Sequence, residues 1–471
     1  MSGRRILVLG CSLLLTSVAT GQCLPTEIYP SDTHFWQLFG ASVSASLNGD
    51  TLVIGARQDN NDAGDQAGAG YVWVRDGESW IVQAKLIGSD TSSGDYLGAS
   101  AAVSADGNTA LVGAYRADEL RGATYVFVRT GLLWTEQTKL NVPDIEPEDF
   151  TGDELGLSAD GNIAILSDNR DDDLGEFAGA AHIFVRVGTK WTHQQKLLAH
   201  DGAAGDDFGR AVDISADGSA VIVGATGDED AGHSTGAAYV FVWSTKKFSW
   251  IHEAKLTACD AEAGDQFGSS VSISGAGSVA VVGAFQDEPG GSAYLFTRNG
   301  STWIERARVT PLGNRPNANF GNDIDLSDDG VTAVIGADGN AGYPEWSGSA
   351  YVFEWQDEQW SEVSPIQRCY GEYLSIYGSA DAISPEGDVA IVGAFWENTS
   401  YLNGGAAFLY DLTTPPCIGD VNCDGSVNAG DLAILLFYWG QCEDCIECVW
   451  DLDHDCVVGA TDLLMLLSHW G

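Results

Sequence analysis

Oxygen-bearing side chains recur at short intervals near the C-terminus, in the stretch GDVNCDGSVNAGD. Alternate positions hold acids or amides, and a glycine stands at position 6, where a twelve-residue calcium loop needs its sharp turn. Position 7 offers a backbone carbonyl, and a carboxylate closes position 12. Because Ca²⁺ prefers such a cage of oxygens, the spacing predicts a calcium site. The expected ligands are Asp420, Asn422, Asp424, Ser426, Asn428 and Asp431.

A second copy of this loop follows 31 residues later, as WDLDHDCVVGATD. Its expected ligands are Asp451, Asp453, Asp455, the carbonyl of Val457, and Asp462. Cys456 replaces the turn glycine, and Gly459 offers no side-chain oxygen at position 9. A residue other than glycine at positive φ costs about 1 kcal/mol, so we expect the second site to be the weaker one. The apolar segments 432–439 and 463–470 predict one helix after each loop.

The duplicated loop–helix unit has aspartate at position 12 of both loops, and no helix precedes the first loop. In these features residues 417–471 resemble a type I dockerin, a small calcium-binding module related to EF-hands. The resemblance implies docking to a cohesin domain on a partner protein. It also implies that positions 10 and 11 of each loop contact that partner: Ala429, Gly430, Ala460 and Thr461. The alternative is that calcium only folds the tail, without a cohesin.

The preceding chain is an internal repeat marked by glycines. Seven FG-like pairs contribute the first glycine of each unit, and another glycine follows nine residues after each. Six residues further on comes a Gly-Ala pair, except in the third unit, which has Ser167-Asp168. The seven leading glycines are Gly40, Gly98, Gly152, Gly209, Gly268, Gly321 and Gly378. Repeats of roughly 55 residues, each with four short strand patterns and glycine turns, predict a mainly β fold: a seven-bladed β-propeller.

The seventh unit has only three strand patterns, at 377–382, 389–394 and 406–412. Residues 26–32, TEIYPSD, match the end of a fourth strand, KLTACD at 255–260. We therefore expect an N-terminal strand to complete the seventh blade, which removes the last open sheet edge.

These units resemble FG-GAP repeats, the blades of integrin α-subunit heads and of many exported bacterial proteins. The resemblance covers about 370 residues. It implies a propeller domain over 22–412, joined to the C-terminal unit by a short linker at 413–416. Integrin-type calcium loops lie between the first and second strands, but here that connection is a tight turn such as Ala105-Asp106-Gly107. Calcium is therefore not expected on the blades.

Residues 1–21 read as a secretory signal peptide, because Arg4 and Arg5 precede a short apolar run that ends in small residues. The protein is expected to be exported and to lie outside the cell or at its surface, with no transmembrane segment. Its formal charge is 22 − 67 = −45. The negative electrostatic field of such a protein repels polyanions, so neither nucleic acid nor an anionic membrane is an expected partner.

Nearly half of the acidic residues fall in the loops between strands two and three and in those between blades. A propeller places these loops on one face. The sequence leaves two interpretations open: a solvated face, or a binding face for a carbohydrate or a cationic ligand. The eight histidines show no metal-ligand spacing, and no nucleophile motif or phosphate-binding loop is present.

The sequence favours an exported, non-enzymatic binding or scaffold protein, attached by a calcium-folded dockerin to a cohesin-bearing partner. The dockerin resemblance also implies an association with polysaccharide-degrading or cell-surface assemblies. The alternative is an enzyme, a polysaccharide hydrolase or lyase whose propeller carries the active site. Carboxylate pairs are too abundant for any one pair to be singled out as catalytic.

A disulfide between Cys23 and Cys417 is predicted from two alignments of the seventh blade. One places Cys23 at the start of the closing strand, and the other places Cys417 at the same hairpin end. Antiparallel neighbours there are about 4.5–5.5 Å apart at Cα, which suits a disulfide. Peptide mapping without reduction should recover a Cys23–Cys417 linked pair. Pairing of Cys417 within the C-terminal cysteine cluster, with Cys23 free, is the alternative that would contradict it.

Overall fold

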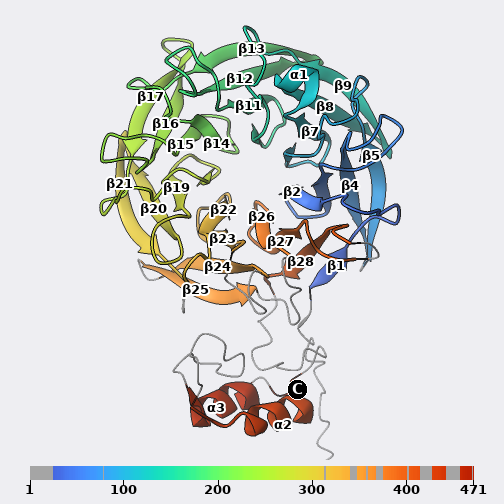
Figure 1. Cartoon of the computed structure of the whole chain (residues 1–471), viewed down its shortest axis with the longest axis vertical. Coiled ribbons are helices and arrows are strands. Elements are labelled where there is room, and N and C mark those ends of the chain that lie inside the picture. The colour runs from blue at the N-terminus through green and yellow to red at the C-terminus, as the bar shows by residue number, and fades with distance from the viewer. Residues whose placement is uncertain are drawn as a thin grey trace, which may run out of the picture.

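Seven four-stranded antiparallel sheets form a closed ring in the computed structural model (Figure 1). The structure describes residues 25–77, 79–311, 315–339, 347–356, 359–366, 375–399, 402–413, 427–441, 457–468 and 470. The predicted seven-bladed propeller is confirmed, and blades 1 to 6 each run in chain order from the centre outward.

The first three blades contain twelve strands and one short helical turn, α1 (Ala117–Leu120). Blade 1 is β2 (Phe39–Ala45), β3 (Thr51–Ala56), β4 (Ala69–Asp76) and β5 (Ser79–Leu86). Blade 2 is β6 (Ala101–Val103), β7 (Thr109–Ala114), β8 (Ala123–Thr130) and β9 (Leu133–Leu140). Blade 3 is β10 (Leu155–Leu157), β11 (Ile163–Asp168), β12 (Ala180–Val187) and β13 (Lys190–Leu197).

The other four blades repeat the pattern, and the last borrows its outer strand from the N-terminal end. Blade 4 is β14 (Phe208–Ile214), β15 (Ala220–Ala225), β16 (Ala237–Ser244) and β17 (Ser249–Leu256). Blade 5 is β18 (Val271–Ile273), β19 (Val279–Ala284), β20 (Ser292–Asn299) and β21 (Thr302–Val309). Blade 6 is β22 (Phe320–Leu326), β23 (Thr332–Ala337), β24 (Ser349–Gln356) and β25 (Gln359–Ile366). Blade 7 is β26 (Tyr377–Ile383), β27 (Val389–Ala394), β28 (Ala406–Asp411) and β1 (Thr26–Ile28).

The N-terminal strand closes the ring as the sequence predicts. β1 pairs with β28 in the register Thr26↔Leu409 to Ile28↔Ala407. The alignment of TEIYPSD with KLTACD is also confirmed by side chains beyond the strand. Asp32 contacts Lys85 at 2.8 Å, and Asp260, its counterpart after blade 4, contacts Arg308 at 2.8 Å.

The hydrophobic core lies between the faces of adjacent blades. The central strands are apolar and almost wholly buried, as in β15, because both of their faces are covered. Third-strand aromatics pack edge-to-face on the aromatic residue of the FG pair; the Phe208 and Tyr239 ring centroids are 5.4 Å apart. One such cluster joins Ile165 and Ile183 of blade 3 to Val221 of blade 4.

Glycines set the distance between neighbouring blades. The glycine of the Gly-Ala pair in one blade faces the carbonyl of the FG glycine in the next. A Cβ atom on Gly283 would lie 2.1 Å from the oxygen of Gly321, and one on Gly55 would lie 1.9 Å from the oxygen of Gly98. Backbones that approach this closely leave no room for any side chain. The regular glycine spacing in the sequence therefore reflects packing between blades.

The C-terminal residues form two short helices, α2 (Ala429–Phe437) and α3 (Ala460–Ser468), with a two-residue pairing of β29 (Gly440–Gln441) and β30 (Val457–Val458). Four residues form the small core, in two pairs related by the 31-residue repeat: Val427 and Val458, Leu435 and Leu466. Both helices start three residues earlier than expected and end before the predicted tryptophans. The first turn of each helix includes positions 10 and 11 of the preceding loop. These residues are not part of the apolar pattern from which the helices were predicted.

Among the described residues, no helix is both long enough and apolar enough to span a bilayer.

Replacing Gly283 with alanine should destabilise the propeller by about 1–3 kcal/mol, because a methyl group must displace the backbone of the next blade. Urea unfolding followed by tryptophan fluorescence would measure this. Gly300→Asn is the matched control, since Gly300 lies in an open hairpin turn at φ 66° that asparagine tolerates. Equal stability of wild type and Gly283→Ala would contradict the packing role.

Candidate functional site

The first candidate site is the start of α2, where the first predicted calcium loop ends. The side-chain oxygen of Asn428 accepts the N–H of Gly430 at 2.8 Å, and Asp431 Oδ2 accepts the N–H of Asn428 at 2.7 Å. This capping box fixes the helix start. The Asp431 side chain is fully buried, which brings a carboxylate into the interior at the positive end of the helix.

The second copy repeats half of this arrangement at the start of α3. Asp462 is fully buried, and its Oδ2 accepts the N–H of Gly459 at 2.7 Å. Because glycine has no side chain, the other hydrogen bond of the capping box is absent here. Two buried carboxylates in equivalent places are hard anionic oxygen donors of the kind that Ca²⁺ binds, so the described part of both loops fits the metal.

The structure describes only part of the predicted sites. Asn428, Asp431, Val457 and Asp462 are described, and all four lie at the starts of α2 and α3 or in β30. The other ligands lie outside the described residues: Asp420, Asn422, Asp424, Ser426, Asp451, Asp453 and Asp455. The predicted signal peptide and the predicted Cys23–Cys417 pair also lie outside them. The predicted contact residues open the two helices, where Ala429, Ala460 and Thr461 are exposed and Gly430 is half-buried.

On the propeller, many loop acids serve as counter-ions within the fold. In blade 1 the Tyr71 hydroxyl donates to Asp59 at 2.7 Å, and Lys85 bridges Asp59 and Asp32 at 2.9 and 2.8 Å. One aspartate comes from the loop between strands two and three and the other from the connection between blades. Similar clamps pair Tyr125 with Lys139, Tyr239 with Lys255, and Tyr294 with Arg308.

These clamps add a third role to the two interpretations of the acidic loops, because part of the charge is neutralised internally. A cluster of three aspartates at blade 4 shows this most clearly. Asp201, Asp228 and Asp230 converge so that one oxygen of each lies within 4.8 Å of the others. Lys255 Nζ contacts all three, at 2.9, 2.7 and 2.5 Å. An ammonium group therefore occupies the position that a metal ion would take.

Blade 3 differs at the same location. His182 replaces the clamp tyrosine, and Asp168 replaces the alanine of the Gly-Ala pair. His182 Nε2 lies 2.8 Å from Asp168 Oδ2, and His182 Nδ1 lies 3.0 Å from His193 Nε2. Burial lowers the pKa of His182 to about 4 and raises the pKa of Asp168 to about 8. The structure thus joins two histidines whose sequence spacing suggested no shared site.

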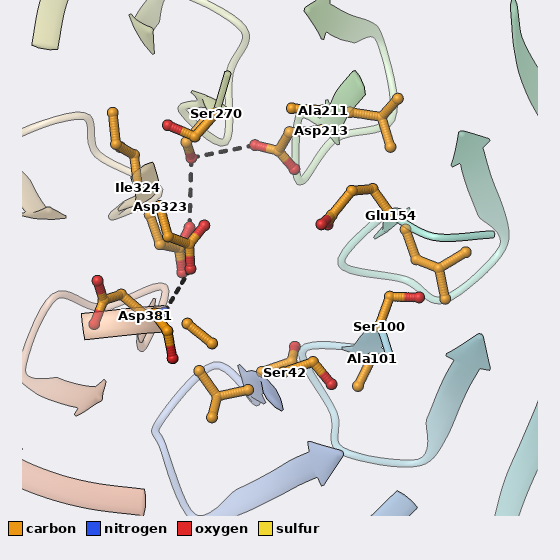
Figure 2. A pocket seen from close by; sticks show the side chains of 18 of the residues that line it. Ser42, Ser100, Ala101, Glu154, Ala211, Asp213, Ser270, Asp323, Ile324 and Asp381 are labelled. Atoms are coloured by element: carbon orange, nitrogen blue, oxygen red, sulfur yellow. Dashed lines mark hydrogen bonds between the residues drawn. The ribbon is translucent and has the colours of Figure 1, made fainter. Parts of the chain in front are cut away.

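A cavity of about 500 Å³ lies at the centre of the ring and is lined by the innermost strands (Figure 2). The charged groups in its lining are mostly acidic, with Arg57 and Arg210 as the basic residues. The acids are Asp153, Glu154, Asp213, Asp323, Asp325, Asp338 and Asp381. Their number was not anticipated, because the repeat unit itself places serine or apolar residues at most of these positions.

Several channel acids bind backbone groups of the next blade. Asp213 Oδ2 accepts the N–H of Ile273 at 2.8 Å, and Asp325 Oδ2 accepts that of Ile383 at 2.8 Å. In other blades a serine hydroxyl does the same: Ser44 accepts from Val103 at 3.1 Å. Burial raises the pKa of Asp213 to about 7 and that of Asp325 to about 8, although these hydrogen bonds favour the charged form.

Two channel acids differ from this pattern. Figure 2 shows Glu154 extending toward the centre of the channel. Its side chain is exposed to the channel, and the protein atoms around the channel, followed by the nearby Asp153, raise its pKa to about 8. Asp381 is the β26 counterpart of Val43 and Ile324 in the other blades. Its carboxylate is buried, and neither oxygen has a hydrogen-bond partner. Burial, and then the nearby Asp323, raises the pKa of Asp381 well above its ordinary value.

The sequence comparisons match both parts of the chain. FG-GAP repeats match residues 26–73, 80–127, 191–241, 250–296 and 303–353, and a type I dockerin domain matches residues 418–470. The chain belongs to the FG-GAP repeat family and carries a type I dockerin domain at its C-terminal end. Domains of both kinds are typical of extracellular proteins, and type I dockerins bind calcium.

Structural comparison supports the fold alone. The β-propeller domain of Cps50 (Swd1) from Myceliophteria thermophila superposes with a TM-score of 0.53 and 12% sequence identity. The match covers 82% of this chain and 99% of that domain. No curated protein matches the chain in sequence.

Asp381→Val should stabilise the propeller, by about 1–3 kcal/mol at neutral pH, because it removes an unpartnered buried carboxyl group from an apolar position. In the folded state the raised pKa keeps this group protonated while the unfolded chain releases the proton. Wild-type stability should therefore fall as pH rises above about 4, the unfolded pKa, and the advantage of the variant should grow. Thermal unfolding at pH 4.5, 6 and 8 tests this.

The exposed Asp76 supplies the control, since Asp76→Asn should show no such trend. A gap between wild type and Asp381→Val that stays constant with pH would contradict the assignment of a protonated Asp381. All samples should contain the same excess of calcium, so that folding of the dockerin does not contribute to the difference.

Proposed function

We propose that this protein is an exported, non-enzymatic recognition or scaffold protein, in which the propeller binds a ligand and the dockerin attaches it to a cohesin-bearing partner. The observation that carries the proposal is the presence of a type I dockerin domain after an FG-GAP propeller in one chain. A dockerin implies tethering, and a propeller with loops gathered on one face implies a recognition module.

Calcium is proposed to bind in both dockerin loops, with the second site the weaker. Each ion would be held by the oxygens of one loop together with the buried carboxylate of Asp431 or Asp462. Bound calcium would supply folding free energy, because the ligands come together only in the folded module. Asn428 adds a side-chain oxygen in the first loop where Gly459 has none in the second, which supports unequal affinities.

A binding role is favoured over catalysis by the way in which the channel acids are used. Asp213, Asp323 and Asp325 accept backbone N–H groups of the neighbouring blade. Carboxylates held in this way position strands and are poorly placed to take up and release protons during a reaction.

The runner-up is a polysaccharide hydrolase or lyase with its active site in the channel. One observation favours it: Glu154 points into the channel and has a pKa raised to about 8, so it could donate a proton at neutral pH. Incubation of the secreted protein with a polysaccharide panel separates the two. New reducing ends or unsaturated products, lost in Glu154→Gln, would establish the enzyme.

Asp431→Ala should abolish the tighter of two calcium-binding events and weaken capture by a cohesin panel at least about tenfold, since it removes the position-12 ligand. Calorimetric titration of the chelator-treated full chain would measure binding, and a pull-down with and without chelator would measure capture. Asp76→Ala is the control and should behave as wild type. Capture that survives chelator, or that needs only the propeller, would reject the proposed tether.

A further inference from the structure

A continuous set of aromatic side chains lies on the loop face of blades 1 to 3. We call it the aromatic arc, and it consists of Phe35, Trp36, Tyr96, Tyr115, Phe150 and Phe177. It belongs to the same connections that form the aspartate clamps: those between strands two and three and those between blades. Phe35, Trp36 and Phe177 are 59%, 50% and 44% exposed, so both ends of the arc face solvent.

Ring contacts link members of the arc to one another, and a hydrogen bond links the arc to Gln58. The rings of Tyr96 and Tyr115 meet edge-to-face at 5.9 Å, and those of Tyr115 and Phe150 at 5.7 Å. At one end the Gln58 amide donates to the Tyr96 hydroxyl at 3.3 Å. Gln58 also lines a depression of about 670 Å³, together with Phe35, Trp36, Asn60, Asp65 and Gln66. The arc thus begins in a hollow rich in amides.

The chain holds several of these rings in an unfavourable backbone conformation. Tyr96 and Phe150 have φ of 60° and 58°, in the left-handed region that aromatic residues seldom adopt. Blades 4, 5 and 6 place the polar residues Asp207, Gln266 and Asn319 at this position, and blades 1 and 7 place the aliphatic residues Leu38 and Ile376 there. Blade geometry requires the conformation everywhere, but it does not require aromatic residues in blades 2 and 3. Ligand contact is one reason for aromatic residues at both of these positions.

Two arginines complete the arc and differ from the basic residues of the aspartate clamps. The Arg116 guanidinium lies 4.7 Å from the Tyr96 ring centroid, and that of Arg170 lies 4.5 Å from Phe150 and 5.4 Å from Phe177. In the part of the chain that the structure describes, neither has a carboxylate within ion-pair distance, whereas Lys85, Lys139, Lys196 and Lys255 are all held by aspartates. Their N–H donors stay available beside the rings.

From this surface we infer that the aromatic arc is the ligand site of the propeller and that its ligand is a neutral polysaccharide chain. The inference deepens the proposed recognition role and rests on it. Sugar rings present apolar C–H faces that pack on aromatic rings, and hydroxyl groups that pair with amide and guanidinium donors. A path over three blades suits an extended chain, and the net charge of −45 disfavours an acidic polymer.

The test uses the full chain and binding to microcrystalline cellulose, mixed-linkage β-glucan, galactomannan and, as the acidic arm, polygalacturonate. We expect binding to at least one neutral polymer. Tyr96→Asn with Phe150→Asn should weaken it at least about tenfold, because two aromatic contacts are lost. Both changes introduce the residue that blade 6 carries at Asn319, so the backbone conformation is preserved. Arg116→Gln with Arg170→Gln should weaken binding severalfold.

Gln266→Asn is the matched control: it changes the same position in blade 5, away from the arc, and should bind as wild type. Unfolding midpoints of all variants should agree with wild type. Binding to none of the neutral polymers, binding only to polygalacturonate, or unchanged binding by the aromatic double variant would each overturn the inference. Cohesin capture measured on the same samples distinguishes failure of this inference from failure of the proposed function, since polysaccharide binding can be absent while calcium-dependent tethering persists.

Discussion

Close backbone contact between blades is the constraint on which the rest of this protein depends. Each Gly-Ala glycine meets the carbonyl of the next FG glycine at a distance that admits no Cβ atom, as between Gly336 and Gly378. Parallel bridges link neighbouring blades beside it, and the bridge between Phe39 and Gly405 closes the circle. These contacts and bridges hold neighbouring blades together around the ring, and β1 pairs with β28 to complete the outer edge of the last blade.

The same close packing explains why charge inside the ring is tolerated. With the first strands held near one another, side-chain oxygens can reach backbone donors across a blade boundary, as Ser44 and Asp213 do. An aspartate can therefore replace a serine at these positions, although burial raises the pKa of its carboxyl group. The Asp381 carboxyl group has no such hydrogen bond, because its counterparts in other blades are apolar and its surroundings provide no donor. At some positions, therefore, the acidic residues of the channel have a structural role in joining blades. No such role accounts for Glu154.

The sequence predicts the number of blades, the closing strand and the acidic loop face, because each follows from residues that repeat at fixed spacing. It does not predict which loops meet. The clamp of Tyr71, Lys85 and two aspartates brings together residues from two blades, and only the ring geometry makes them neighbours. Similarly, the breaks at Ser167-Asp168 and His182 look like sporadic losses of a motif, while the structure joins Asp168, His182 and His193 in one hydrogen-bonded chain.

Charge pairing distinguishes two kinds of cation on the loop face, those of the aspartate clamps and those of the aromatic arc. Where lysine or arginine meets aspartate, as in blades 4 and 5, the cation is held within the fold and adds little to the surface. Arg116 and Arg170, in blades 2 and 3, instead lie on aromatic rings of the arc, and no carboxylate among the described residues is within ion-pair distance of either. In this arrangement two arginines form no ion pair with any carboxylate that the structure describes, and aromatic residues adopt positive φ. Both departures occur in one place, which is the physical reason to regard that place as a site.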